Sequence, residues 1–175
     1  MTDLLGLTIT ADRVELRTVS DADVPDIHTH FTPDITRYMH PKAAADIEET
    51  KLFVVTARRN ARAGIDLQMV VRRKANSEFL GCVGLHDLDR LDPETGVWIK
   101  QAAHGQGLGR EAVSALLDWA QQQLNFTHVR YPVDRRNTAS RAIAEHLNGV
   151  IHREFRSISA AGTELDQFEY WIAKR

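Results

Sequence analysis

A glycine-rich turn near the middle of the chain has the spacing of a phosphate-binding loop. Gly105, Gly107 and Gly109 alternate with larger residues, and glycine adopts positive φ angles and lets a ligand approach the backbone. Apolar residues then recur on one helical face, at positions 113, 116, 117, 120 and 124. A helix therefore begins at the glycines. Because its first N–H groups lack intrahelical partners and its dipole is positive there, the turn predicts a site for a phosphate or pyrophosphate.

Two well-known phosphate motifs are excluded at this turn. A P-loop ends in Gly-Lys followed by Ser or Thr, and the chain has no such triplet. A dinucleotide fingerprint needs Gly or Ala at its third conserved position, where this chain has Arg110. The second absence also excludes a nucleotide-dependent oxidoreductase. A plain glycine linker is less favoured than a binding loop, because a strand is predicted before the turn and a helix after it.

Polar side chains outside the turn could bind a ligand or move a proton. Glu94 begins a predicted strand, and His86, whose reference pKa is near neutral, ends another. Asn137 and Ser140 stand at the start of a predicted helix. Each has a structural alternative: an edge salt bridge for Glu94, a hydrogen-bonded structural role for His86, an N-cap for Asn137 and an exposed first-turn position for Ser140. Asp87 is a third candidate base beside Glu94 and His86.

Composition bounds the class of protein. The chain has 175 residues, which predicts one domain over 1–175 with a sizeable core. Its formal net charge of −2 argues against a nucleic-acid partner. Its eight histidines show no metal-ligand spacing, so we expect no metal. The single cysteine, Cys82, lies in an apolar run and is interpreted as a buried structural thiol. No signal peptide or membrane-spanning stretch is recognised, so we expect a cytoplasmic protein with no membrane contact.

Basic residues occur in short runs. We interpret Arg58-Arg59 and Arg72-Arg73-Lys74 as solvated surface, which is the usual role of such runs. Arg135-Arg136 lies beside Asn137 and is therefore a candidate contact for a 3′-phosphate.

The periodicity predicts the elements that would position these residues. Strands are expected over residues 7–19, 67–73, 79–88, 93–99, 129–133, 150–159 and 166–173, and helices over 20–30, 35–39, 44–62, 108–124 and 137–147. This order describes an α/β (mixed α+β) domain on one mostly antiparallel sheet. Pro132 has no N–H to donate, so strand 129–133 should be unpaired on one side there. Such a gap would leave backbone groups free for a ligand.

Five segments together resemble the GNAT N-acetyltransferases, and the RimJ/RimL-like branch in particular. The turn, read from His104 to Gly109, is similar to the family's pyrophosphate loop, with His104 in place of the usual Arg or Gln. The other segments are Arg13-Val14-Glu15-Leu16-Arg17 with Ser20-Asp21-Ala22-Asp23, Phe79-Leu80-Gly81-Cys82-Val83-Gly84-Leu85-His86, Glu94-Thr95-Gly96-Val97-Trp98-Ile99, and Asp134-Arg135-Arg136-Asn137-Thr138-Ala139-Ser140-Arg141. The chain departs from the family at Leu147-Asn148-Gly149-Val150 and at Pro132.

The resemblance implies a fold, an activity and a set of site residues. The fold would be a twisted sheet of about seven strands with helices on both faces and a splay between the two central strands. The donor would be acetyl-CoA, and a primary amine, either a protein N-terminus or a small amine, would attack its thioester directly. The implied acetyl-CoA contacts are Trp98, Ile99, Lys100, His104, Gly105, Gln106, Gly107, Leu108, Gly109, Arg110, Asn137 and Ser140. Ser140 matches the branch's proposed acid and Glu94 its carboxylate base, with His86 as the other candidate base.

The resemblance leaves one alternative function and one question of oligomeric state. A non-catalytic module that binds CoA and regulates another protein would keep the fold without turnover. The presence of both Ser140 and Glu94 argues against it. By analogy alone, a homodimer through the C-terminal strands is also considered.

Overall fold

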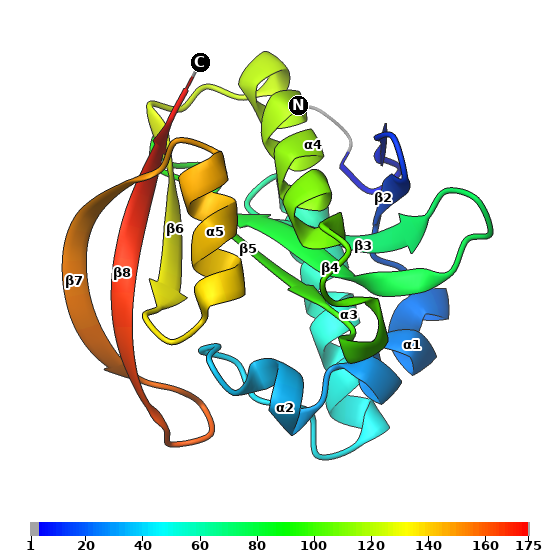
Figure 1. Cartoon of the computed structure of the whole chain (residues 1–175). Helices are drawn as coiled ribbons and strands as arrows, with labels where there is room; N and C mark the ends of the chain where they lie inside the picture. The colour runs from blue at the N-terminus through cyan, green and yellow to red at the C-terminus, as the bar shows by residue number, and fades with distance from the viewer. Residues whose placement is uncertain (1–3, 175) are drawn as a thin grey trace.

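The computed structural model describes residues 4–174, which form an eight-stranded sheet in the order β1-β2-β3-β4-β5-β6-β8-β7. Neighbouring strands are antiparallel except β5 and β6, which are parallel. The strands are β1 (Thr8–Thr10), β2 (Val14–Thr18), β3 (Leu67–Arg73), β4 (Phe79–His86), β5 (Glu94–Ile99), β6 (His128–Asp134), β7 (Val150–Ile158) and β8 (Glu164–Ala173). The expected mixed, mostly antiparallel architecture is confirmed (Figure 1).

The sheet has eight strands where about seven were expected, because the single strand predicted over residues 7–19 is a hairpin of β1 and β2. The N–H of Ala11 donates to the carbonyl of Val14 at 2.9 Å, which turns the chain between β1 and β2. Ile9 then lies opposite Leu16. The alternation of apolar and polar residues changes phase at Asp12-Arg13, a signal of the turn that the prediction of a single strand overlooked.

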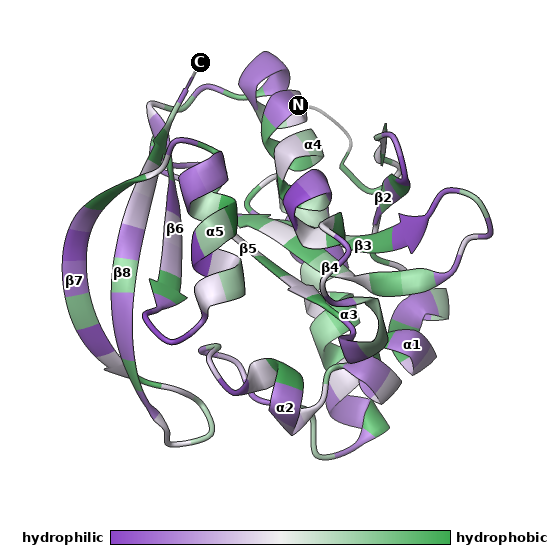
Figure 2. Cartoon of the chain, in the orientation of Figure 1, coloured by the Kyte–Doolittle hydropathy of each residue, from purple (hydrophilic) through white to green (hydrophobic). Residues whose placement is uncertain are grey.

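Helices cover both faces of the sheet, as expected (Figure 1). One face carries α4 (Leu108–Gln123) and α5 (Thr138–His146), and the other carries η1 (Asp21–Asp23), α1 (Val24–His30) and α3 (Ile47–Ala63), while α2 (Pro33–Thr36) lies in the connection between α1 and α3. A short turn of helix, η2 (Gln101–Ala103), precedes the glycine turn. The predicted apolar face of α4 is buried at Val113, Leu116, Leu117 and Ala120. The edge strand β7 instead mixes hydrophilic and hydrophobic residues along its length (Figure 2).

The gap predicted beside Pro132 is confirmed. The only register pair between β5 and β6 is Glu94 with Arg130, whereas β6 pairs with β8 along its whole length. The N–H of Arg130 makes a last bond to the carbonyl of Pro93 at 2.8 Å. Beyond this point the two parallel strands diverge, and their facing backbone edges are left open to a ligand.

The start of α1 is anchored by a buried carboxylate. Asp23 is fully buried and accepts hydrogen bonds from Arg72 at 2.7 Å and from the N–H and Oγ of Ser20 at 2.9 and 2.8 Å. Arg17 adds a longer bond at 3.1 Å. The interpretation of residues 72–74 as solvated surface is therefore wrong for Arg72, whose side chain is 18% exposed. This network fixes α1 against β3, and α1 leads into one wall of the site.

Candidate active site

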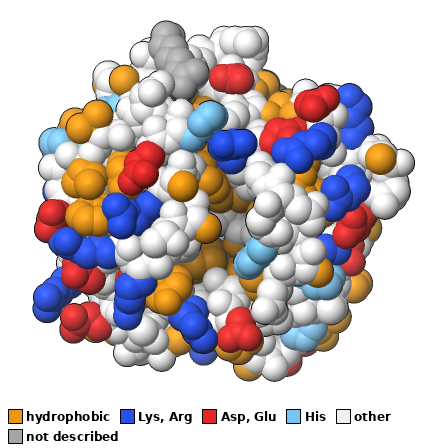
Figure 3. Space-filling model, in the orientation of Figure 1, with side chains coloured by type: hydrophobic (Ala, Val, Ile, Leu, Met, Phe, Trp, Pro, Cys, Tyr) orange, Lys and Arg blue, Asp and Glu red, His pale blue; other side chains and the backbone are white. Residues whose placement is uncertain are grey.

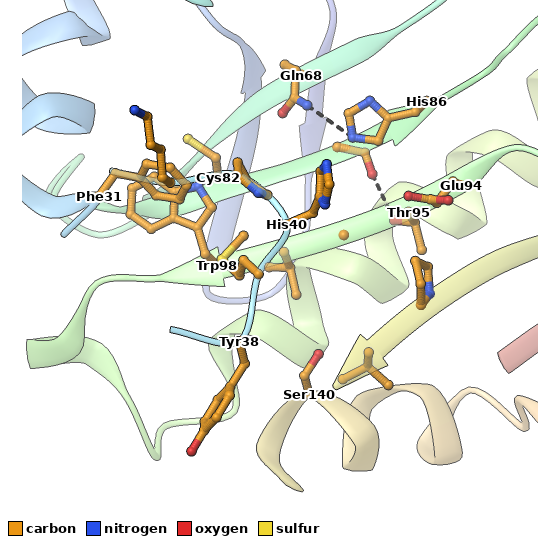
Figure 4. A pocket seen from close by; sticks show the side chains of 18 of the residues that line it. Phe31, Tyr38, His40, Gln68, Cys82, His86, Glu94, Thr95, Trp98 and Ser140 are labelled. Atoms are coloured by element: carbon orange, nitrogen blue, oxygen red, sulfur yellow. Dashed lines mark hydrogen bonds between the residues drawn. The ribbon is translucent and has the colours of Figure 1, made fainter. Parts of the chain in front are cut away.

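A cavity of about 590 Å³ lies where β5 and β6 diverge. Its mouth is the hollow at the centre of the molecular surface, with hydrophobic side chains visible inside it (Figure 3). The wall opposite the sheet comes from α1, α3 and the segment that joins α2 to α3. Glu94, His86, Trp98, Asn137 and Ser140 all line this cavity. The structure therefore brings together the candidate proton-transfer groups that the sequence singled out (Figure 4).

The cavity floor is made by three pairs of facing residues on β4 and β5. Cys82 lies opposite Trp98, Gly84 opposite Gly96, and His86 opposite Glu94. Since side chains on a strand alternate between its faces, all three pairs lie on the same face of the sheet. The floor thus has an apolar end, a middle without side chains, and an ionisable end. A Cβ added to Gly96 would meet no atom within 4 Å, which shows that the space above this glycine is open.

Glu94 is the better placed of the two candidate bases. Its burial raises the pKa of its carboxyl group above the ordinary value, although nearby Arg130 and His86 act in the opposite direction. The side chain is 35% exposed and accepts a bond of 3.1 Å from Arg130 Nη1. A carboxylate with a raised pKa that stays in contact with solvent can accept a proton through water. The expected edge salt bridge and the base role are therefore compatible.

His86 has both ring nitrogens engaged. Its Nε2 lies 3.2 Å from Nε2 of Gln68, and its Nδ1 lies 3.4 Å from a carboxylate oxygen of Asp66. With the amide of Gln68 donating to Nε2, the proton of the neutral ring is on Nδ1 and points to Asp66. In this arrangement His86 has no free lone pair, which favours its structural role.

Ser140 lies at the start of α5, beside a tyrosine that sequence reasoning missed. Asn137 caps the helix and accepts a bond of 3.1 Å from the N–H of Ser140, which confirms the expected N-cap. The hydroxyl of Tyr131 lies 2.9 Å from Oγ of Ser140. Tyr131 also lines the cavity and is 1% exposed, and its burial raises the pKa of its phenol to about 12. Its position in a strand beside Pro132 was the only signal in the sequence that could have pointed to it.

The glycine turn has the predicted backbone. Gly105 and Gly107 have φ angles of 74° and 73°, and Gly107 is the N-cap of α4. A Cβ on Gly105 would meet nothing within 4 Å, so the turn is open on that side. Gly109 differs, because it lies within the helix and a Cβ there would approach Ile99 Cγ1 to 3.3 Å. Gly109 thus lets α4 pack closely against β5.

Cations surround the turn although His104 replaces the usual Arg or Gln. Arg13 Nη1 donates to the carbonyl of Gln106 at 3.0 Å, and Arg73 Nη2 lies 3.3 Å from the Gln106 side-chain oxygen. Among residues 4–174 the guanidinium of Arg110 has no hydrogen-bond or ion-pair partner, and it lies beside Gly107. Arg13 and Arg73 are remote in sequence from the turn and were not predicted to lie there.

The side chain of His104 tethers the turn to β5. Its Nε2 lies 2.6 Å from the carbonyl oxygen of Ile99, so this nitrogen carries the proton that is donated. The carbonyl group of Ile99, which faces the gap, is therefore hydrogen-bonded to the residue that begins the glycine turn.

Of the three implied acetyl-CoA contacts at the end of β5, only one presents its backbone to the gap. Trp98, Ile99 and Lys100 were all implied contacts, but the N–H of Lys100 donates to the carbonyl of Leu80 at 2.7 Å. In an antiparallel ladder the backbone groups of alternate residues point to the same neighbour. Those of Trp98 therefore also point to β4, and those of Val97 and Ile99 face the gap.

Other candidate groups have structural partners. Arg135 pairs with Glu154 and Asp166, and Arg136 pairs with Asp134, so their charges are already matched by carboxylates. Cys82 is buried, which raises the pKa of its thiol and confirms the interpretation of an inert core cysteine.

Residues 4–174 contain neither a cluster of metal-ligating side chains nor a helix that could span a membrane. No three or more His, Cys, Asp or Glu side chains come together as a metal site within this range. No helix of the described part is both long and apolar enough to cross a lipid bilayer.

Comparison with known proteins gives a consistent result. The sequence profile of the Acetyltransferase (GNAT) domain matches residues 13–150. No curated protein sequence matches the chain. Among solved structures, RimL, the ribosomal L7/L12 alpha-N-protein acetyltransferase in complex with coenzyme A, has a TM-score of 0.86 at 17% identity, covering 95% of this chain and 98% of that one.

Two further structures share the fold. A GNAT-family acetyltransferase from Bacillus anthracis has a TM-score of 0.82 at 18% identity, with 96% of this chain and 99% of that one covered. An acetyltransferase from Salmonella typhimurium, which modifies the N-terminal serine of ribosomal protein L7/L12, has a TM-score of 0.81 at 15% identity, with 94% and 97% covered. At these identities the structures establish a common fold.

Proposed function

The chain belongs to the GNAT acetyltransferase family, and from this premise we propose that it transfers an acetyl group from acetyl-CoA to a primary amine, with residues 1–175 acting as one domain. The observation that carries the proposal is that Glu94 and Ser140 line the same cavity, at the gap between β5 and β6. A thioester entering through the gap would reach both groups. The RimJ/RimL-like assignment is supported by the fold shared with RimL.

The residues around the glycine turn suit the binding of acetyl-CoA. The open face of Gly105, the N-terminus of α4 and the unpaired guanidinium of Arg110 would hold the pyrophosphate. The backbone groups of Val97 and the N–H of Ile99 that face the gap would hold the pantetheine arm, with Asn137 lining the same cavity. A bound acetyl-CoA supplies an activated acyl thioester.

The proposed proton transfers use groups on opposite sides of the gap. Glu94 accepts a proton from the acceptor's ammonium group through water, and the neutral amine then attacks the thioester. Its raised pKa makes Glu94 a stronger base than an ordinary glutamate. Ser140 donates a hydrogen bond toward the leaving sulfur. Tyr131 stays protonated because its pKa is about 12, and its hydroxyl donates to Oγ of Ser140. The hydroxyl hydrogen of Ser140 is then free to point into the cavity.

Titration calorimetry tests the proposal directly. The purified chain is titrated with acetyl-CoA, free CoA, ATP and NADH, and we expect tight binding of the two CoA compounds only. Thiol release with a panel of amines then measures transfer. Binding of acetyl-CoA with no transfer to any amine would favour the non-catalytic alternative, and no binding at all would contradict the assignment of the loop.

A further inference from the structure

The cavity has an apolar end that the transfer of an acetyl group to a simple amine does not use. We propose that this end binds a bulky apolar group carried by the acceptor, so that the acceptor is a primary amine with an aromatic or branched aliphatic substituent. This inference rests on the proposed function and specifies its second substrate.

A rigid aromatic wall forms the apolar end. The ring of Trp98 lies 4.9 Å from that of Phe31 and 5.8 Å from that of Phe79, measured between centroids. Phe31, Trp98 and Cys82 lie together at one side of the cavity in Figure 4. Phe53 of α3 also lines the cavity, on the wall opposite the sheet. Because packing fixes these rings, a flat or branched apolar group can be buried there without first ordering the wall.

The opposite end of the floor is acidic. Arg130 is the shared partner of Asp87, Asp92 and Glu94, at 2.6, 3.5 and 3.1 Å. Arg90 also pairs with Asp92, so three carboxylates share two guanidiniums and still leave an excess of negative charge, which attracts a protonated amine. The cavity therefore offers an anionic end for the ammonium and an apolar end for what the amine carries.

The spacing of the two ends fits one small acceptor. Gly96 lies between them, and Trp98 is two residues further along β5, or about 7 Å. An amine nitrogen above Gly96 therefore lies one side-chain length from the aromatic wall. The missing side chain of Gly96 leaves room for the carbon chain that joins the two groups.

The cavity also opens to the surface at α3, which distinguishes an acceptor from a long acyl chain. Phe53 is 40% exposed, and Glu49, one turn earlier on α3, is exposed and lines the same cavity. An acceptor must enter from solvent, and this opening provides a route. An acyl chain instead arrives with the thioester through the gap beside Ser140 and needs no second opening.

The test uses tripeptides that differ only in their first residue: phenylalanine, leucine, serine or aspartate, followed by two glycines. With acetyl-CoA as donor, we expect kcat/KM for phenylalanine and leucine to exceed that for serine by at least about tenfold. Equal or better use of the serine peptide would overturn the inference and leave the transfer function intact. If no amine is acetylated, the proposed function fails and the inference fails with it.

Two variants of α3 locate the preference. Phe53→Ala should reduce kcat/KM for the phenylalanine peptide about tenfold more than it reduces kcat/KM for the serine peptide. Leu52→Ala is the matched control, because Leu52 is 66% exposed and does not line the cavity. If Phe53→Ala alters the preference between acetyl-CoA and octanoyl-CoA but not the preference among peptides, the apolar end holds the acyl chain and the inference is wrong.

A binding measurement without turnover completes the test. With free CoA present, calorimetry should show that phenylalaninamide binds at least about tenfold more tightly than glycinamide, and Phe53→Ala should remove that difference. Equal affinities in the unaltered protein would overturn the inference independently of any kinetic result.

Discussion

Gly84 and Gly96 face each other across β4 and β5 and leave the middle of the cavity floor without side chains. The two glycines have different surroundings. A Cβ on Gly84 would come within 2.8 Å of the side chain of Gln68, whereas one on Gly96 would enter open space. Gly96 is therefore the position at which the cavity can be filled without disturbing the fold.

Gly96→Val should reduce kcat/KM by at least about tenfold and leave the melting temperature unchanged or raised, because valine suits a strand better than glycine. Thiol-release kinetics and calorimetric melting measure the two effects. Gly6→Val is a control, since a Cβ there also meets nothing within 4 Å but lies outside the cavity. An active Gly96→Val enzyme would mean that substrates do not pass over this glycine.

Gly105→Ala should weaken acetyl-CoA binding. Its φ of 74° costs a non-glycine residue about 1 kcal/mol, and the added methyl occupies the face offered to the phosphates. Gly162→Ala controls for the strain, because Gly162 has a φ of 80°, has open space around it and lies in the β7–β8 turn. Calorimetry should show at least about tenfold weaker binding for Gly105→Ala only. Similar affinities in the two variants would exclude Gly105 from the binding site.

The hydroxyls of Tyr131 and Ser140 should behave as one unit. Ser140→Ala should lower kcat about tenfold, a modest loss because a thiol has a pKa of only about 8.5 and leaves without much help. Tyr131→Phe should lower kcat less, and the double variant should be no slower than Ser140→Ala alone. The dissociation constant of acetyl-CoA, measured by calorimetry, should stay unchanged in all three. Additive losses would mean that Tyr131 acts independently of Ser140.

Local signals in the sequence were enough to predict the main features of the site. A missing N–H at Pro132 predicts the gap, and the glycine at position 107 predicts the start of α4. Asn137 predicts a helix cap, which the structure confirms. Each of these features depends on the chemistry of one or a few neighbouring residues, so no knowledge of the rest of the fold is required.

What could not be predicted depends on contacts between distant residues. Arg13 lies 93 residues before the carbonyl it contacts in the glycine turn. The buried pairing of Arg72 with Asp23 joins β3 to the start of α1, and a basic run in the sequence does not reveal its partner. Tyr131 was missed because its role depends on α5 packing against β6. Only the assembled sheet brings these groups together.

Asp23→Asn should destabilise the fold by about 3–5 kcal/mol at neutral pH, because it removes the buried partner of Arg72. Burial alone would raise the pKa of Asp23, but bonds from Arg72 and Ser20 outweigh it and lower the pKa. The stabilising contribution is therefore complete above the unfolded pKa of about 3.9 and is lost as pH falls through the lower folded value. Urea unfolding at pH 7 and pH 3 should show the loss shrinking in acid. A loss that is the same at both pH values would contradict this origin.

Glu94→Gln should abolish the dependence of kcat/KM on the ionisation of a carboxylate. Burial raises the pKa of Glu94, so the active, deprotonated form accumulates as pH rises through a value above the ordinary one of about 4.3. A pH profile of the unaltered enzyme should show this ascending limb, and the variant should lack it and turn over at least about a hundredfold more slowly. A variant that keeps the limb would assign it to another group, with His86 as the next candidate.

The same substitution should not destabilise the protein at neutral pH. Since the folded pKa is raised, the protonated form favours folding, and this contribution is lost as pH rises through the folded pKa. Glutamine mimics the protonated form, and Arg130 keeps Asp87 and Asp92 as partners. The melting temperature of Glu94→Gln should therefore equal or exceed that of the unaltered protein at pH 7.

Glu78→Gln provides a control of opposite sign. Bonds from Lys100 and Arg73 lower the pKa of Glu78 to about 2, so its contribution is present at neutral pH and lost only as pH falls through that value. Glu78→Gln should therefore lower the melting temperature at pH 7, where Glu94→Gln does not. If Glu94→Gln also lowers the melting temperature at pH 7, the ion pair with Arg130 contributes more to stability than burial of the carboxylate costs. The role of Glu94 is then to stabilise the fold rather than to act as a base.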